Sequence, residues 1–227
     1  MPRTTLPHRS RRIAAPAALA LAAALGLSAC GSAATGAAGQ EMAVSKSASN
    51  SPYQATVLPA AYQKPDLVLG DTSGKPFSLR ERTAGKAVLL YFGYTSCPDV
   101  CPTTMGDIAV ALQKLPAEQR DRIQVVFVST DPERDTPAKL RSWLDSFDKS
   151  FIGLTGDLAK VKAAAASLHV LVEDPIVNKD GTVTSSHGAE VLGFLPSDDR
   201  AHLLYLSQSS VAVFAHDLPL LAKGVRP

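Results

Sequence analysis

Residues 87–102 read AVLLYFGYTSCPDVCP, and this stretch decides the fold. Its first seven residues form a continuous apolar run, which is typical of a strand covered on both faces. Cys97 and Cys101 follow with three residues between them, and Pro102 suits the first turn of a helix. A buried strand that leads into a dithiol turn at the start of a helix is the layout of a redox-active site or of a soft-metal site.

The segments that flank this stretch alternate between helix and strand patterns. After the cysteines, apolar residues recur at positions i, i+3, i+4 and i+7 and predict a helix. Its apolar face consists of Met105, Ile108, Ala109 and Leu112. Thr136 and Asp157 are suited to cap the N-termini of two further helices. The remaining predictions are strands at residues 123–129, 151–154, 188–195 and 201–206, and a last helix over about 209–222 that Pro219 is expected to kink or break.

Upstream of the central strand, residues 66–69 and 76–79 flank the turn-rich segment 71–74 and predict an N-terminal β-hairpin. Strand–helix alternation that ends in an antiparallel pair of strands predicts an α/β sandwich. The expected fold is therefore an α/β, thioredoxin-like fold with an N-terminal β-hairpin extension, over residues 63–224. A segment of this length can bury its own hydrophobic core.

The first 29 residues are predicted to be a signal peptide. Four arginines precede an Ala- and Leu-rich stretch over residues 13–27, which is shorter than the ~20 residues that a transmembrane helix needs. The stretch ends in Leu-Ser-Ala-Cys30, which resembles a bacterial lipobox and implies cleavage before Cys30 and lipidation of its thiol. The expected location is the extracytoplasmic face of the bacterial cell membrane, with a lipid anchor. An ordinary signal peptide cut near Ala29 remains the alternative, and the export route, general secretory or twin-arginine, stays open.

Residues 30–62 are predicted to be a flexible tether, since Gly, Ala, Ser and Gln dominate the segment and cannot bury enough surface to order it. Removing residues 1–29, which hold four arginines and no acidic residue, changes the formal net charge from +2 to −2. The basic character of the whole chain thus belongs to its leader. No basic surface for DNA or RNA is expected on the mature protein.

The cysteine count favours a reactive pair. With Cys30 lipidated, Cys97 and Cys101 are the two thiols that remain. A structural disulfide between them would close a five-residue loop and contribute only about 2 kcal/mol through unfolded-state entropy. A pair this close at a turn is therefore better suited to metal binding or redox chemistry than to stabilising the fold.

One histidine would complete a metal site. His187 lies 86 residues beyond Cys101, in a polar stretch just before a predicted strand, so only the fold can bring the two together. Two thiolates with an imidazole suit Cu(I), Cu(II) or Zn(II) and leave a position open for exchange. A lone loop histidine does not itself establish a ligand. The other histidines of the predicted domain are interpreted as surface or capping residues: His169, His202 and His216.

Three motifs then give a specific resemblance. Residues 94–102 (YTSCPDVCP), 129–136 (STDPERDT) and 153–156 (GLTG) are similar to signatures of the Sco (SenC) family of copper chaperones, over nearly all of residues 65–222. The resemblance implies a non-enzymatic, membrane-tethered domain that supports assembly of the dinuclear copper centre of cytochrome c oxidase. It implies one copper ion, Cu(I) and/or Cu(II), held by Cys97, Cys101 and His187. The implied partners are the copper-centre subunit of the oxidase and, further, a copper donor or another cuproenzyme.

Asp131 is a candidate for tuning the site without binding the metal. It lies at the C-terminal end of a predicted strand, the edge where sites in α/β sheets gather. The resemblance links an aspartate in this motif to metal and redox behaviour, and a turn-capping carboxylate is the alternative. Ser186 departs from the pattern, because family members commonly carry Asp immediately before the histidine. That departure bears on copper affinity and not on ligand identity.

Two other functions use the same elements. A thiol–disulfide reductase that keeps the oxidase's copper-ligand cysteines reduced would need only Cys97 and Cys101. A peroxiredoxin shares the fold, but Leu90 and Tyr94 occupy the positions where those enzymes carry Pro and Thr. The leading prediction is a copper chaperone whose binding depends on the redox state of the dithiol, because a disulfide removes both thiolates.

Overall fold

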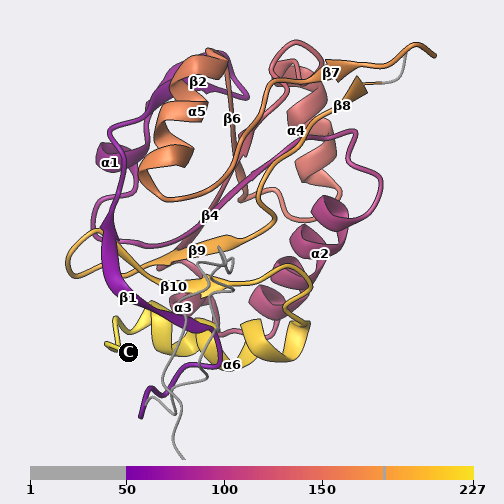
Figure 1. Cartoon of the computed structure of the whole chain (residues 1–227). Coiled ribbons are helices and arrows are strands. Elements are labelled where there is room, and N and C mark those ends of the chain that lie inside the picture. Colours follow the sequence, from indigo (N-terminus) through magenta and orange to yellow (C-terminus); the bar gives the residue numbers. More distant parts are fainter. Residues whose placement is uncertain (1–49, 181–182) are drawn as a thin grey trace, which may run out of the picture. The chain divides into compact units, whose positions relative to one another are not determined.

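The structure, a computed structural model, describes residues 50–180 and 183–227 (Figure 1). The predicted signal peptide, the lipobox with Cys30 and the first part of the predicted tether lie outside the described residues.

One mixed sheet of eight strands forms the centre of the domain, in the order β1-β10-β9-β4-β5-β6-β2-β3. A separate short hairpin pairs β7 with β8. The strands are β1 (Thr56–Gln63), β2 (Val68–Asp71), β3 (Pro76–Ser78), β4 (Ala87–Gly93), β5 (Ile123–Ser129), β6 (Ile152–Thr155), β7 (Ile176–Val177), β8 (Val183–Thr184), β9 (Val191–Phe194) and β10 (Arg200–Tyr205).

Helices cover both faces of this sheet (Figure 1). They are α1 (Leu79–Arg82), α2 (Val100–Gln113), α3 (Ala117–Arg120), α4 (Pro137–Asp145), α5 (Leu158–Ser167) and α6 (Val211–Ala222). Alternate residues of β4 enter two separate cores. Leu89 and Tyr91 pack with α2, α4 and α6, whereas Leu90 and Phe92 pack with α5. All seven residues of β4 are buried, as its continuous apolar run predicted.

The register of the central strands brings three loops to the same end of the sheet, the one where β4 and β5 finish. β4 and β5 are parallel, with Gly93 opposite Ser129, and β9 runs antiparallel to β4 with Val191 opposite Tyr91. Three segments therefore meet at this end of the sheet. They are the cysteine turn, the loop after β5 and the segment before β9.

Most predicted elements are confirmed. β2 and β3 form the N-terminal hairpin, with Leu69 opposite Phe77. The hydroxyl of Thr136 accepts a hydrogen bond from the backbone N–H of Lys139 at 3.3 Å and caps α4. Asp157 caps α5 in the same way, accepting from the N–H of Ala159 at 2.9 Å. Of the kink or break predicted at Pro219, the break is wrong: α6 runs through Pro219 to Ala222. Leu218 and Leu221 on both sides of Pro219 are fully buried, so packing holds the two halves in one helix.

The predicted end of the tether at residue 62 is also wrong. β1 is the edge strand beside β10, and the chain is already packed before it begins. Tyr53 is buried, and its hydroxyl donates to the carbonyl of Val225 at 2.6 Å. The N–H groups of Gln54 and Ala55 each donate to the buried carboxylate of Asp217 at 2.9 Å. The folded domain thus includes at least residues 53–62.

We expect Asp217→Ala to lower the free energy of unfolding by about 2–4 kcal/mol. The substitution leaves the N–H groups of Gln54 and Ala55 without their charged acceptor, and each such loss costs about 1–2 kcal/mol when the donor is buried. Urea denaturation of the full-length protein measures the effect. Asp145→Ala is the control, since its pair with Arg141 is exposed and worth less than about 0.5 kcal/mol. Equal losses in the two variants would contradict a special role for Asp217.

Candidate metal centre

The two thiols differ in exposure. Cys97 is partly exposed and Cys101, in the first turn of α2, is fully buried; both are free thiols. The turn is closed by the N–H of Cys97, which donates to the carbonyl of Tyr94 at 3.2 Å. The N–H of Cys101 lies 3.4 Å from the Sγ of Cys97 and donates to it. This bond holds the Cys97 sulfur against the start of α2.

Gly93 provides the space for the buried sulfur. A Cβ atom at this position would lie 3.0 Å from the Sγ of Cys101 and 3.0 Å from the Cε2 of Phe127. Both distances are shorter than ordinary van der Waals contact, so a larger residue would push the strand end away from α2. The glycine that ends β4 therefore lets the cysteine approach the sheet closely.

His187 completes the site from a distant segment. Its Nε2 lies 3.5 Å from the Sγ of Cys101, and its Nδ1 lies 2.7 Å from the carbonyl oxygen of Gly188. Because a carbonyl only accepts hydrogen bonds, Nδ1 carries the proton of the neutral ring and Nε2 offers its lone pair to a metal. A β-bridge to Val172 and the bond from the N–H of Gly188 to the carbonyl of Leu171, at 2.8 Å, fix the segment.

The three side chains form one compact set of ligand atoms. The Sγ atoms of Cys97 and Cys101 and a ring nitrogen of His187 all lie within 4.8 Å of one another. Ligand atoms bound at about 2.0–2.3 Å from a shared ion are up to about 4.6 Å apart, so these residues fit one ion with little movement. Sulfur and imidazole donors suit copper or zinc.

Burial keeps two of the three ligands neutral in the absence of metal. Burial raises the pKa of the Cys101 thiol to about 12, and the hydroxyl of Tyr91, 3.5 Å from that sulfur, partly offsets the effect. Burial also lowers the pKa of His187, while the bond to Gly188 acts in the opposite direction. His187 is thus a neutral imidazole at pH 7, ready to bind metal without losing a proton.

Asp131 lies near the site but is not one of its three ligand atoms. Its buried carboxylate forms an ion pair with Arg134. The Arg134 guanidinium lies over the ring of Tyr94, 5.8 Å from its centre, and that ring meets His187 edge-on at 5.6 Å between centres. Asp131 is thus connected to the histidine only indirectly, through the side chains of Arg134 and Tyr94. Its predicted influence on the metal remains a prediction.

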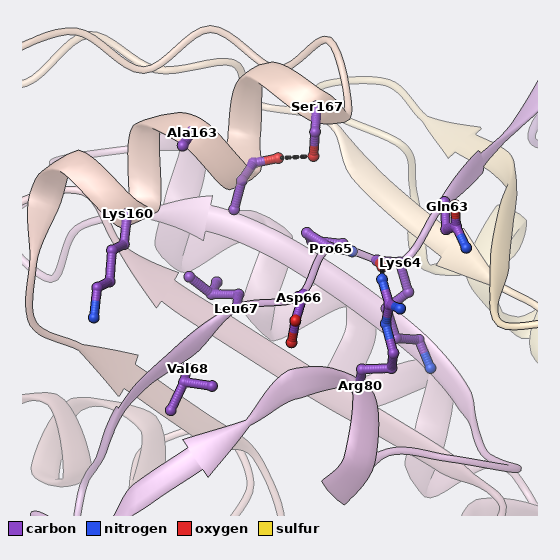
Figure 2. Close-up of a pocket in the computed structure, with 11 residues that line it drawn as sticks. Gln63, Lys64, Pro65, Asp66, Leu67, Val68, Arg80, Lys160, Ala163 and Ser167 are labelled. Atoms are coloured by element: carbon purple, nitrogen blue, oxygen red, sulfur yellow. Dashed lines mark hydrogen bonds between the residues drawn. The ribbon is translucent and has the colours of Figure 1, made fainter.

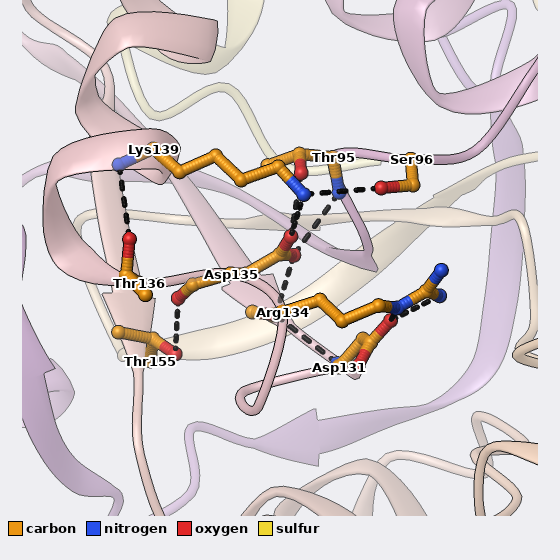
Figure 3. Close-up of polar contacts among 9 residues, drawn as sticks. Thr95, Ser96, Asp131, Arg134, Asp135, Thr136, Lys139 and Thr155 are labelled. Carbon is orange, nitrogen blue, oxygen red and sulfur yellow. Dashed lines mark hydrogen bonds and ion pairs between the residues drawn. The ribbon is translucent and has the colours of Figure 1, made fainter. Parts of the chain in front are cut away.

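The sequence analysis missed Asp135, four residues further along the same loop. Its carboxylate is fully buried and accepts hydrogen bonds from both the N–H and the hydroxyl of Thr95 (Figure 3). Thr95 lies two residues before Cys97. No pattern in the sequence marks this contact, because the two residues are 40 positions apart.

The other histidines of the domain each have a different neighbour. His169 packs against the ring of Tyr62, His202 pairs with Asp198 and His216 with Asp217. None of the three joins the cluster that contains His187.

One cavity among the described residues lies away from the cysteines. It has a volume of about 580 Å³ and is lined by Arg80, Lys160 and the chain after β1 (Figure 2). Gln63, which lines the cavity, pairs with Arg200 at the start of β10. The cavity therefore lies toward the opposite end of the strands from the cysteine turn. The buried Lys64 beside it is fully engaged with Thr83 and Asp199.

Comparison with known proteins assigns these features to a family. The SCO1/SenC family profile matches residues 55–218. Copper-bound ScoI of Bradyrhizobium japonicum is 33% identical, with a TM-score of 0.60, and the match covers 71% of this chain and 98% of that one. Apo Sco1 of Thermus thermophilus is 34% identical, with a TM-score of 0.65 and coverage of 74% and 96%. These likenesses confirm the thioredoxin-like α/β fold.

Curated relatives are matched over part of their length. The mitochondrial protein SCO2 of Saccharomyces cerevisiae is 38% identical over 107 residues, which are 47% of this chain and 35% of that protein. For four such relatives the match covers between 35% and 65% of their length, which is less than two thirds in each case.

We expect iodoacetamide to modify Cys97 before Cys101 in the reduced, metal-free protein. Cys97 is partly exposed, whereas burial of Cys101 excludes the reagent and raises the thiol pKa, so little thiolate is present at pH 8. Peptide mass spectrometry over a time course should show a rate difference of at least about tenfold. In urea the two rates should converge; similar rates in the folded protein would contradict the burial of Cys101.

Proposed function

The chain belongs to the SCO1/SenC family, and on that premise we propose that it is a metallochaperone that binds one copper ion and delivers it to the dinuclear copper centre of cytochrome c oxidase. The observation that carries this proposal is the cluster of Cys97, Cys101 and His187, whose ligand atoms lie within 4.8 Å of one another. The copper-bound relative from Bradyrhizobium japonicum supports the choice of metal.

The ligands suit a cargo that must arrive and leave. Two thiolates and one imidazole suit a copper ion, and three protein ligands leave room for an incoming ligand from a partner. Cys97 is the partly exposed member, so exchange begins on its side of the site. Both thiols must lose their protons for copper to bind, which makes binding dependent on pH.

Redox state provides the gate in this proposal. Oxidation of Cys97 and Cys101 to a disulfide removes two electrons and two protons, which pass to the oxidant, and leaves His187 as the remaining ligand. One imidazole does not retain copper against a competing site. The oxidised protein would therefore neither take up nor carry the ion.

The proposed location is the extracytoplasmic face of the cell membrane, with a lipid on Cys30. Support for the anchor comes from the lipobox, since residues 1–49 lie outside the described part of the chain. Within residues 50–180 and 183–227, no helix is both long and apolar enough to cross a bilayer. The partner would be the copper-centre subunit of the oxidase, with a copper donor or another cuproenzyme as further partners.

A second function, thiol–disulfide reductase, is favoured by one observation: an accessible cysteine lies in front of a buried one. In such an enzyme Cys97 would attack the partner's disulfide and Cys101 would then release the mixed disulfide. A reductase has no use for an imidazole beside the thiols, and the position of His187, 3.5 Å from the Sγ of Cys101, makes the reductase the less favoured function.

We expect His187→Ala to weaken Cu(I) binding by more than roughly tenfold, since even the outer partners of a metal ligand are typically worth 10- to 100-fold. The measurement is an anaerobic titration of the reduced full-length protein against a competing chelator. All variants carry Cys30→Ser, so that Cys97 and Cys101 are the thiols that titrate. His169→Asn is the control, because Asn tolerates the left-handed backbone of that position, where φ is 59°.

Tight one-to-one binding that is lost with His187 would support the three-ligand site and the chaperone. Weak binding that does not depend on His187 would overturn it and leave a bare dithiol, the reductase. A preference for Zn(II) over Cu(I) in the same titration would overturn the choice of metal.

A further inference from the structure

The three residues that precede Cys97 each contact the segment that follows β5, and Figure 3 shows these contacts for Thr95 and Ser96. Each of them meets a different side chain of that segment. The contacts are Arg134 over the ring of Tyr94 at 5.8 Å, Asp135 on Thr95 at 3.0 and 2.5 Å, and the Nζ of Lys139 on the Oγ of Ser96 at 3.1 Å. The start of the cysteine turn is therefore held at three consecutive positions.

Asp135 is the centre of these contacts and the buried one. Its side chain is fully buried, and its carboxylate accepts three hydrogen bonds. The N–H and hydroxyl of Thr95 donate at 3.0 and 2.5 Å, and the hydroxyl of Ser129 donates at 2.7 Å. The Nζ of Lys139, at 3.8 Å, supplies a positive charge. An ionised carboxylate accepts but does not donate, so its chemistry fits this set of donors.

The backbone of Asp135 is fixed as well. Its N–H donates to the carbonyl of Asp131 at 2.9 Å, and its own carbonyl accepts from the hydroxyl of Thr155 at 3.0 Å. The carboxylate is therefore presented from a rigid loop between β5 and α4. A group held in this way can transmit its own position to Thr95, and through Thr95 to the cysteine turn.

We propose that Asp135 is a positioning residue of the metal centre: by holding Thr95, it sets the distance between the dithiol turn and His187. This inference rests on the proposed function. Tyr94, the neighbour of Thr95, contacts both parts of the site. Its carbonyl accepts the N–H of Cys97, and its ring meets the ring of His187. A shift of the Tyr94–Thr95 segment would therefore move one ligand relative to another.

The near-isosteric variant Asp135→Asn tests the role. An amide keeps one acceptor oxygen and places an NH₂ group against donors that the second oxygen had satisfied, so the hold on Thr95 weakens. We expect Cu(I) affinity to fall roughly 10- to 100-fold, the range found when outer partners of metal ligands are removed. The absorption spectrum of the Cu(II) form should also change, since it reports the arrangement of the ligands around the metal.

A copper-free measurement tests the same role independently. In a glutathione buffer, the two thiols lose two electrons and two protons to glutathione disulfide, which becomes two glutathiones. A disulfide requires the sulfurs to approach to about 2.05 Å. We expect Asp135→Asn to shift this equilibrium, because a turn that is no longer held at Thr95 changes how closely the two sulfurs can approach each other.

Thr83→Val is the control. It removes a fully buried hydroxyl that bonds Leu79 and Lys64, and it leaves every contact of Asp135 in place. If Asp135→Asn does not fold, Thr95→Val replaces it, since this variant loses only the hydroxyl bond and should shift both measurements in the same direction by less. All variants are full-length and carry Cys30→Ser.

The role of Asp135 would be overturned if Asp135→Asn lowered the melting temperature as the control does but left copper affinity, the Cu(II) spectrum and the thiol equilibrium unchanged. Failure of the wild-type protein to bind copper one-to-one would instead refute the proposed function. The glutathione equilibrium would then still decide whether Asp135 positions the dithiol.

Discussion

The parallel pairing of β4 with β5 is the constraint on which the site depends. Gly93 and Ser129 lie opposite each other, so the chain leaves both strands at the same edge and in the same direction. The turn that carries Cys97 and the loop that carries Asp135 must then run side by side. This adjacency explains why the two sequence motifs at residues 94–102 and 129–136 act on one small volume: one supplies the sulfurs and the other holds the start of their turn.

The histidine reaches the same volume by a different constraint. β9 pairs antiparallel with β4, so the segment that precedes β9 arrives at the edge where β4 ends. A single bridge between Val172 and His187, with the carbonyl of Gly188 on Nδ1, orients the ring. In this chain a backbone carbonyl does the orienting. The serine at position 186, where the resemblance leads one to expect aspartate, therefore leaves the tautomer fixed and removes only a nearby negative charge.

The sequence predicted the parts of the fold that are governed by local patterns. β4 and β5 stand out because their residues are apolar throughout, and the caps at Thr136 and Asp157 follow from single side chains. β1 was missed because it is an edge strand: Pro59 interrupts it, and its residues alternate only weakly between partly buried and exposed. β1 pairs with β10, and the two residues before it bond Asp217, more than 160 residues away; no local pattern contains these contacts.

The site was predictable to the same extent. The cysteines are visible from their spacing, whereas His187 followed from the family resemblance and Asp135 from neither. Burial changes the pKa of two of the three predicted ligands, Cys101 and His187. A buried thiol with a raised pKa stays protonated while the site is empty, so Cys101 is a poor nucleophile until a cation replaces its proton. A bound copper ion would supply the positive charge that stabilises the buried thiolate. Metal binding and disulfide exchange both need the Cys101 thiolate, so burial opposes both. The position of His187, 3.5 Å from that sulfur, is the physical reason to rank the chaperone above the reductase.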